Sequence, residues 1–229
     1  MVKIAENLKI VLAEIEKSKL KRKIAVDEKI ILIAVTKNHG ADFMREVIDL
    51  GVTDIGENRI QEAAEKFQVL DRKVARHLIG HLQTNKVKQA VKLFDLIHSV
   101  DSEHLAAAID KAASSAEKIQ DVLIQVNLAK EDSKSGVYEE NLQSLIEAVD
   151  ALKNLRLRGL MMIAPNYSDV EQGRPLFAEM RKIFDERKKN RQAFDFLSMG
   201  MTNDYKIAIE EGANVVRIGT AIFGARNYF

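Results

Sequence analysis

The sequence has 229 residues, of which 46% are hydrophobic and 30% are charged, so it can bury a sizeable core beneath a charged surface. The 35 basic and 34 acidic residues nearly cancel, which excludes a broad basic surface of the kind that binds nucleic acid or anionic membranes. The chain has no cysteine, which excludes disulfides, thiol nucleophiles and cysteine-ligated metal sites, and favours a reducing compartment such as the cytosol.

The first segment has the pattern of an amphipathic helix. Ile4, Leu8, Val11, Leu12 and Ile15 lie at helical spacing, and acidic residues interrupt the apolar run. Such an interrupted run is unlike a signal peptide, and no apolar stretch approaches the ~20 residues that a membrane-spanning helix needs. We therefore expect a helix packed on the domain, a cytoplasmic protein, and neither a membrane nor nucleic acid as a partner.

Beyond that helix, short β-branched apolar runs alternate with longer amphipathic segments. Helix signals between the runs include Ser102 as an N-cap before "EHLAAAIDKAA" and Gly51 as a C-cap after "ADFMREVIDL". Strands that alternate with helices indicate parallel pairing and right-handed crossovers. Eight runs are predicted to be strands, at residues 30–37, 52–58, 75–81, 93–100, 121–128, 155–164, 194–200 and 214–224.

Eight such units after an N-terminal helix predict an α/β fold, the (β/α)8 or TIM barrel. An open doubly wound sheet is the other architecture compatible with the pattern. No linker or shift in composition divides the chain, so we expect a single domain over residues 1–229. The pattern shows no long exposed apolar patch, which favours a monomer.

The first predicted strand, "IILIAVTK", ends in Lys37, and in such barrels the active site lies at the carboxyl ends of the strands. A lone lysine at this place more often rests its stem on the core and extends its ammonium group into water. The alternative is an amine held in a desolvated site, where it forms a Schiff base with a carbonyl compound. The rest of the sequence has to decide between the two.

The C-terminal part favours the Schiff base. "LSMGMTND" ends the seventh predicted strand and "VRIGTAIFG" contains the eighth, and barrels frequently bind phosphate after these two strands. Ser198, Thr202 and Thr220 offer hydroxyl groups, while Gly200 and Gly219 allow backbone N–H groups to approach an anion. Each residue alone is better explained by tight packing or a helix cap, but two such loops in one barrel indicate a phosphate site.

Arg217 lies two residues before Gly219 in the last predicted strand. One alternative is a salt bridge to a neighbouring helix, and the other is a buried donor to a ring nitrogen. A lysine, a phosphate cradle and such a donor match the aldehyde, the phosphate and the pyridine nitrogen of pyridoxal 5'-phosphate (PLP). This combination predicts PLP as the cofactor, bound on Lys37.

The histidines give weaker signals. His77 and His81 are four residues apart on one predicted strand, but no acidic residue accompanies them, so we predict no metal site. A structural or supporting role is favoured for both. We expect His98 to be structural and His39 to line the loop after the lysine.

The motifs together resemble those of the YggS/PROSC family of pyridoxal-phosphate homeostasis proteins along nearly the whole chain. The sequence departs from the family after the lysine, where "NHG" replaces a frequent "TKP", and at Arg59 in "GENRIQE". The matching segments are "IAVTK", "IGENRIQEA", "HLIGHLQTNK", "HSVDS", "IQVNLAKEDSKSG", "RGLMMIA", "LSMGMTNDY" and "VRIGTAIFGAR".

The resemblance implies a barrel like the N-terminal domain of alanine racemase, with PLP held as an internal aldimine on Lys37. It implies that Ser198, Gly219 and Thr220 hold the phosphate, and that Arg217 faces the pyridine nitrogen. Family members are regulators of cofactor and amino-acid balance without an established catalytic activity. The full set of implied cofactor contacts is Lys37, Asn58, His77, Ser198, Arg217, Gly219 and Thr220.

The sequence favours a binding protein over an enzyme, so we assign no catalytic residue. A racemase needs a second acid/base on the opposite face of PLP, and the predicted barrel leaves only residues 225–229 after its last strand. An arginine beside the pyridine nitrogen also makes the ring a poorer sink for carbanion charge. We predict a PLP carrier or regulator that delivers the cofactor to apo-enzymes. The alternatives are a PLP-dependent amino-acid racemase or lyase, and an aldolase that forms its Schiff base directly with a phosphorylated sugar.

Overall fold

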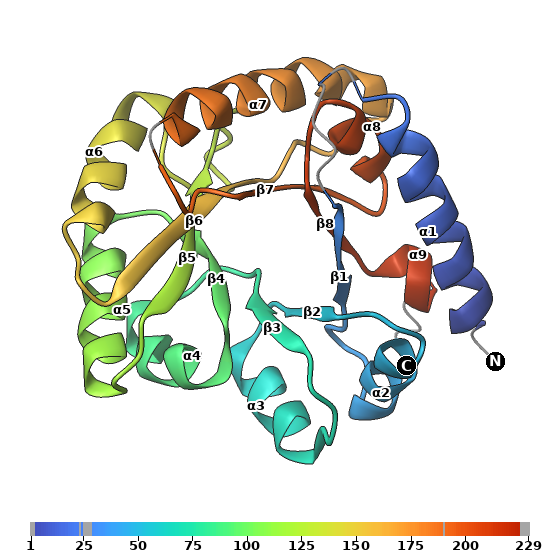
Figure 1. The fold of residues 1–229 in the computed structure, drawn as a ribbon, viewed down its shortest axis with the longest axis horizontal. Coiled ribbons are helices and arrows are strands. Elements are labelled where there is room, and N and C mark those ends of the chain that lie inside the picture. Colours follow the sequence, from blue (N-terminus) through green and yellow to red (C-terminus); the bar gives the residue numbers. More distant parts are fainter. Residues whose placement is uncertain (1–2, 23, 25–28, 190, 225–229) are drawn as a thin grey trace.

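The computed structural model describes residues 3–22, 24, 29–189 and 191–224, and their strands close into one parallel barrel (Figure 1). Strand order follows the chain, and the last strand pairs with the first. The predicted TIM barrel is therefore confirmed, and an open sheet is excluded. The strands are β1 (Ile31–Val35), β2 (Asp54–Glu57), β3 (Ala75–Leu78), β4 (Leu96–Val100), β5 (Gln120–Val126), β6 (Leu155–Met162), β7 (Phe196–Met201) and β8 (Val215–Ile218).

Helices lie around the outside of the barrel (Figure 1). The predicted N-cap is confirmed, because the Ser102 hydroxyl accepts a hydrogen bond from the N–H of Leu105 at 3.3 Å. The helices are α1 (Ile4–Lys19), α2 (Ala41–Asp49), α3 (Ile60–Val69), α4 (Val87–Leu93), α5 (Glu103–Ser115), α6 (Glu139–Asp150), α7 (Arg174–Lys188), α8 (Tyr205–Glu210) and α9 (Thr220–Phe223), with short 3-10 turns η1 (Thr84–Lys86) and η2 (Val170–Gly173).

The N-terminal helix α1 packs outside the barrel against α8 and α9 (Figure 1). Its predicted apolar face is confirmed for Ile4, Leu8, Val11 and Ile15, which are buried, whereas Leu12 is 45% exposed. Within the described part of the chain, no helix is long and apolar enough to cross a membrane.

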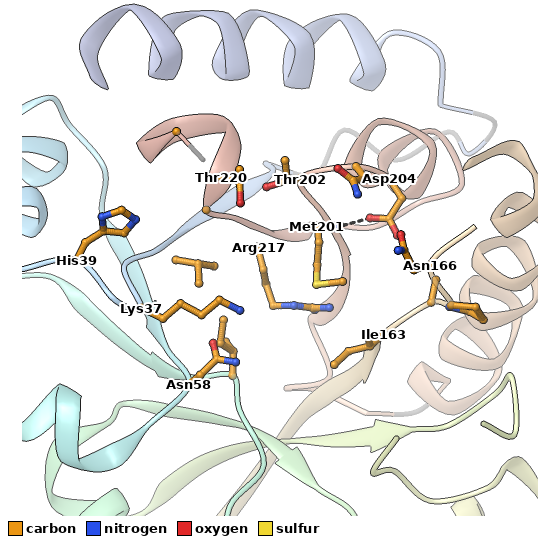
Figure 2. Close-up of a pocket in the computed structure, with 17 residues that line it drawn as sticks. Lys37, His39, Asn58, Ile163, Asn166, Met201, Thr202, Asp204, Arg217 and Thr220 are labelled. Atoms are coloured by element: carbon orange, nitrogen blue, oxygen red, sulfur yellow. Dashed lines mark hydrogen bonds between the residues drawn. The ribbon is translucent and has the colours of Figure 1, made fainter. Parts of the chain in front are cut away.

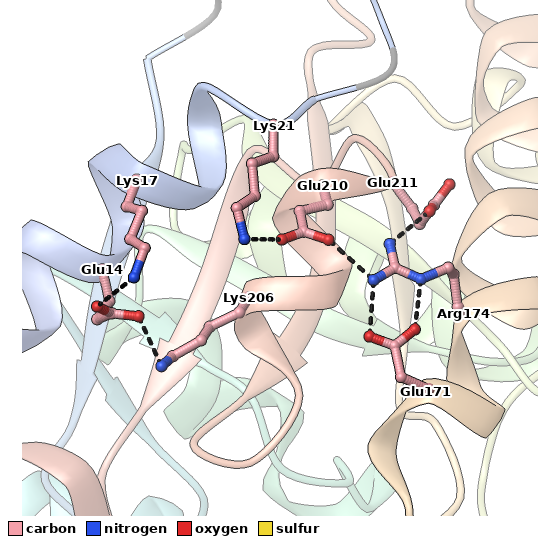
Figure 3. A network of polar contacts seen from close by, with 8 residues as sticks. All are labelled: Glu14, Lys17, Lys21, Glu171, Arg174, Lys206, Glu210 and Glu211. Atoms are coloured by element: carbon pink, nitrogen blue, oxygen red, sulfur yellow. Dashed lines mark hydrogen bonds and ion pairs between the residues drawn. The ribbon is translucent and has the colours of Figure 1, made fainter.

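Ion pairs join α8 to α1 and, through Arg174 of α7, to η2 (Figure 3). Lys206 in α8 lies 2.6 Å from Glu14 in α1. Arg174, at the start of α7, pairs with Glu210 at 2.9 Å and with the buried Glu211 at 2.8 Å, and it also holds Glu171 of η2. Helix α8 begins directly after the loop that follows β7. The ion pairs that hold α8 in place therefore also restrain the end of that loop.

Successive side chains along each strand point alternately toward the surrounding helices and toward the interior of the barrel. Apolar residues that face the helices form the main core, and Leu96, Leu123 and Met161 form a second, smaller cluster that we assign to the barrel interior. The interior of such barrels is usually filled with branched apolar side chains. Here it also contains buried polar side chains, among them His77, His98, Ser198 and Arg217.

Most predicted strand ends differ from those of the structure by a few residues, and two of the differences change how the sequence is interpreted. The run predicted at residues 214–224 stops at Ile218, and α9 begins at Thr220. Strand β3 stops at Leu78, so His81 lies in the following loop, where its Nδ1 is 3.1 Å from the hydroxyl of Ser135. His77 and His81 therefore do not share a strand face.

Candidate cofactor-binding site

A cavity of about 510 Å³ opens at the carboxyl ends of the strands (Figure 2). The side chain of Lys37 extends toward that of Arg217 within it, with Thr202 and Thr220 on one side and Asn58 on the other. Five of the seven predicted contact residues line this cavity: Lys37, Asn58, Arg217, Gly219 and Thr220. The structure thus brings together residues that lie just after β1 and β2 with residues in and just after β8, although they are far apart in the sequence.

An ion-pair network beneath α3 fixes the backbone on either side of the cavity lysine. The buried Lys66 donates hydrogen bonds to the carbonyl of Thr36 and to Oε1 of Glu57, both at 2.8 Å. On the other side, the N–H of Asn38 donates to Glu62, which also pairs with Lys66. Asn38 has φ 63°, a left-handed conformation that is costly for a residue other than glycine. The network holds this conformation, so the lysine leaves the barrel at a fixed place.

Glu57 is the buried acid of this network, and its side chain is fully buried. Burial raises the pKa of Glu57, although hydrogen bonds from Lys66 and Thr36 oppose the increase. The ion pair with Lys66 is short, so we assign the ionised form to Glu57 at neutral pH.

Asn58 supplies the next cavity wall and has an unsatisfied acceptor. Its Oδ1 is buried and has no hydrogen-bond partner among the described residues. Leaving a buried acceptor unpaired costs about 1–3 kcal/mol, so a ligand with a donor at this place would gain a partner. Gly80 packs so closely against the backbone of Asn58 that a Cβ at this position would lie 2.3 Å from the Asn58 carbonyl oxygen, so no larger residue fits there.

The loop between β7 and α8 forms the opposite wall. Thr202 lines the cavity, and the Oδ1 of Asp204 accepts a hydrogen bond from the N–H of Met201 at 2.6 Å, which closes the loop (Figure 2). Burial raises the pKa of Asp204, although the Met201 N–H and the charge of Arg217 oppose the increase. This wall therefore combines donors suited to a phosphate with one titratable carboxyl group.

Arg217 lies at the floor of the cavity and is 3% exposed. Its Nη1 donates to the hydroxyl of Ser198 at 2.5 Å, and its Nη2 donates to the carbonyl of Met162 at 2.9 Å. Burial lowers the pKa of Arg217 to about 10, so the guanidinium is still charged at neutral pH. Both of these partners are neutral, unlike the helix carboxylate that the salt-bridge alternative requires.

The two other predicted contact residues, His77 and Ser198, lie deeper in the barrel and not at the cavity. Ser198 is fully buried, and its hydroxyl is already bound to Arg217. His77 lies 2.9 Å from the carboxylate of Asp54, so it does have an acidic partner, contrary to the sequence-based expectation. Strand β7 runs on to Met201, which places Ser198 one layer below the residues that surround the cavity.

Sequence reasoning missed some cavity residues. Pro165, Asn166 and Asp204 line the cavity, and the sequence signal for the first two was their position directly after the sixth strand. His39 also lines the cavity, as expected for its loop, and its ring lies 5.0 Å from the ring of Phe43.

A family model described as the N-terminal domain of alanine racemase matches residues 15–227. The chain belongs to this family. A pyridoxal phosphate homeostasis protein of Aquifex aeolicus is 43% identical over 199 residues, which cover 86% of this chain and 87% of the relative. The pyridoxal phosphate homeostasis protein of Escherichia coli is 39% identical over 205 residues, which cover 88% of each chain. These relatives confirm the resemblance inferred from the sequence motifs.

Solved structures show the same relationship. PipY of Synechococcus elongatus, in a structure with PLP bound, matches with a TM-score of 0.85 and 35% identity, over 97% of this chain and 100% of PipY. An alanine racemase of Clostridium difficile matches with a TM-score of 0.73 and 18% identity, over 97% of this chain and 57% of the racemase. The racemase shows only that the barrel fold is shared.

Proposed function

We propose that this protein binds PLP in the cavity at the carboxyl ends of the strands and acts as a carrier or regulator in PLP homeostasis. The observation that supports this best is that Lys37 extends toward Arg217 within a cavity that Thr202 and Thr220 also line (Figure 2). An amine, a fixed cation and a set of hydroxyl and N–H donors match the aldehyde, the pyridine nitrogen and the phosphate of PLP. The named relatives and the PLP-bound PipY support the same assignment.

The residues of the cavity fit the separate parts of PLP. When bound, PLP would supply an electrophilic aldehyde, and the amine of Lys37 would be the residue that holds it covalently. Thr202, Thr220 and the N–H of Gly219 would hold the phosphate. The unpaired Oδ1 of Asn58 would accept a hydrogen bond from the ring hydroxyl.

Arg217 supports retention of PLP over turnover. A guanidinium has donors only and stays protonated, so it keeps the pyridine nitrogen as an unprotonated acceptor. An unprotonated ring is a poor sink for carbanion charge, which racemisation and transamination both require. We therefore assign no catalytic role to the residues of the cavity.

We further propose the cytosol as the location of the protein and apo PLP-dependent enzymes as recipients. The absence of cysteine supports a reducing compartment. A reversible C=N bond suits delivery, because hydrolysis returns both the amine and the aldehyde unchanged.

A titration with PLP, followed by visible absorption, tests the proposal. We expect a yellow complex with one PLP per chain, lost in Lys37→Ala and retained in Lys130→Ala, whose lysine lies on the surface. Loaded protein should restore the activity of an apo PLP enzyme, and single-enantiomer amino acids should not racemise. Turnover that depends on Lys37 would favour the racemase or lyase, and a protein that stays colourless with PLP would favour the aldolase.

A further inference from the structure

A series of hydrogen-bonded polar side chains crosses the interior of the barrel beneath the cavity. The four separations are 2.5 Å from Arg217 to Ser198, 3.1 Å from Ser198 to His98, 3.0 Å between the histidines and 2.9 Å from His77 to Asp54. The series starts at the floor of the cavity and ends at Asp54, the first residue of β2, which lies toward the amino ends of the strands. Its members come from β8, β7, β4, β3 and β2.

Burying these polar groups in the barrel interior is not needed to form the barrel. His98 and Ser198 are fully buried and His77 is 6% exposed, so each would cost free energy if left unpaired. Both ring nitrogens of both histidines have hydrogen-bond partners. Apolar side chains would fill the same space without a desolvation cost. We therefore look for the role of these polar residues in the cavity above them.

The two ends of the series fix the direction of its hydrogen bonds. The guanidinium of Arg217 can only donate, so the Ser198 oxygen accepts from it and the Ser198 hydroxyl is free to donate to Nδ1 of His98. At the other end the carboxylate of Asp54 can only accept, so Nε2 of His77 bears the proton. When His77 is neutral, its Nδ1 accepts and Nε2 of His98 donates to it.

The charges in the series agree with this direction. Burial lowers the pKa of His98 well below its ordinary value, and the charge of Arg217 adds to the effect, so His98 is neutral. Burial raises the pKa of Asp54, but hydrogen bonds from His77 and Thr53 outweigh it and lower the pKa overall. The series thus has a cation at one end and an anion at the other, and in this arrangement each group between them donates in the same direction.

We propose that His98 and His77 are positioning residues for the PLP site. By accepting a hydrogen bond from the Ser198 hydroxyl at Nδ1, His98 keeps the lone pairs of that hydroxyl turned toward Arg217. Together with the carbonyl of Met162, the hydroxyl holds the planar guanidinium in one orientation beneath the cavity. The geometry of the series stands on its own, but its consequence for PLP rests on the proposed function.

The first test needs no PLP. The full-length protein, labelled with 15N in its histidines, is studied by NMR near pH 8.5, above the ordinary titration range of imidazole. The proposal predicts that His77 and His98 are both neutral, with the proton on Nε2 and not on Nδ1. A proton on Nδ1 of either ring would reverse part of the series and overturn the proposal.

The second test compares two substitutions of His98. In His98→Gln the amide can still accept from Ser198 and donate to His77, whereas His98→Leu can do neither. With PLP labelled at the ring nitrogen, we expect His98→Leu to shift the 15N resonance and weaken binding about tenfold, as the loss of one buried hydrogen bond implies. His98→Gln should restore both values to near those of the wild type.

The matched control is Leu96→Val, which alters the same strand and the apolar interior cluster but not the series. It should leave the 15N resonance unchanged. Equal losses in His98→Gln and His98→Leu, or no change in either, would assign His98 a packing role and overturn the proposal. If His98→Leu does not fold, the tautomers of the wild-type histidines and the 15N resonance of PLP bound to His98→Gln still test the proposal. A wild-type protein that does not bind PLP would refute the proposed function and leave the tautomer test intact.

Discussion

The ammonium group of Lys66 donates a hydrogen bond to the backbone carbonyl of Thr36 at 2.8 Å, although Lys66 belongs to α3 and Thr36 follows the end of β1. The Thr36 hydroxyl donates in turn to Glu57 at 2.6 Å. Thr36 is the residue before the cavity lysine. A buried cation from a neighbouring helix therefore determines where Lys37 leaves the barrel.

Substitution of Lys66 by methionine should destabilise the protein strongly. Lys66→Met keeps the apolar stem but leaves Glu57 buried without its ion-pair partner, which costs about 3–5 kcal/mol when one member of a buried pair is removed. Urea unfolding measures the free energy of unfolding. The control is Lys130→Met, which breaks the surface pair with Glu140 and should have little effect. Equal stability of the two variants would show that the buried pair does not support the strand end.

Comparing the binding of PLP and pyridoxal distinguishes residues that contact the phosphate from Ser198, whose hydroxyl lies deeper in the barrel. Thr202→Val should weaken the binding of PLP by about 10- to 100-fold, because a hydrogen bond to a charged group is lost. It should hardly change the binding of pyridoxal, which has no phosphate. Ser198→Ala should weaken both ligands alike, because it acts through Arg217. A loss confined to PLP in Ser198→Ala would instead support the direct phosphate contact expected from the sequence.

Asp204 should make PLP affinity depend on pH. Its pKa is raised in the folded protein, so the carboxyl group takes up a proton at a higher pH than an ordinary aspartate does. Ionised Asp204 repels a phosphate in the same cavity, so Asp204→Asn should bind PLP about three- to tenfold more tightly at pH 7.5. The amide can still accept the Met201 N–H. The advantage of the variant should shrink as the pH falls, as measured by dissociation constants at each pH; a constant ratio would contradict this role.

The barrel could be predicted because each buried strand is a short apolar run bounded by polar segments. The run "VRIGTAIFG" shows where that signal ends, since an apolar stretch alone does not separate strand from helix. The structure divides it between β8 and α9, with Gly219 at the boundary.

The cavity residues could be predicted to the extent that they follow strand ends, as Lys37 and Asn58 do. The depth of a side chain along its strand could not, because it depends on where the neighbouring strands end. Ser198 therefore lies one layer lower than expected. The hydrogen bond between His77 and Asp54 could not be predicted either. The two residues are 23 positions apart and meet only because β2 pairs with β3.

The measurement that tests the central claim most directly is to locate the bound cofactor on the chain. The protein is loaded with PLP, reduced with borohydride and digested, and the modified peptide is sequenced by mass spectrometry. We predict a pyridoxyl group on Lys37 and its absence at this position in Lys37→Ala. A reduced adduct on another lysine, with Lys37 unmodified in the wild-type protein, would contradict the account.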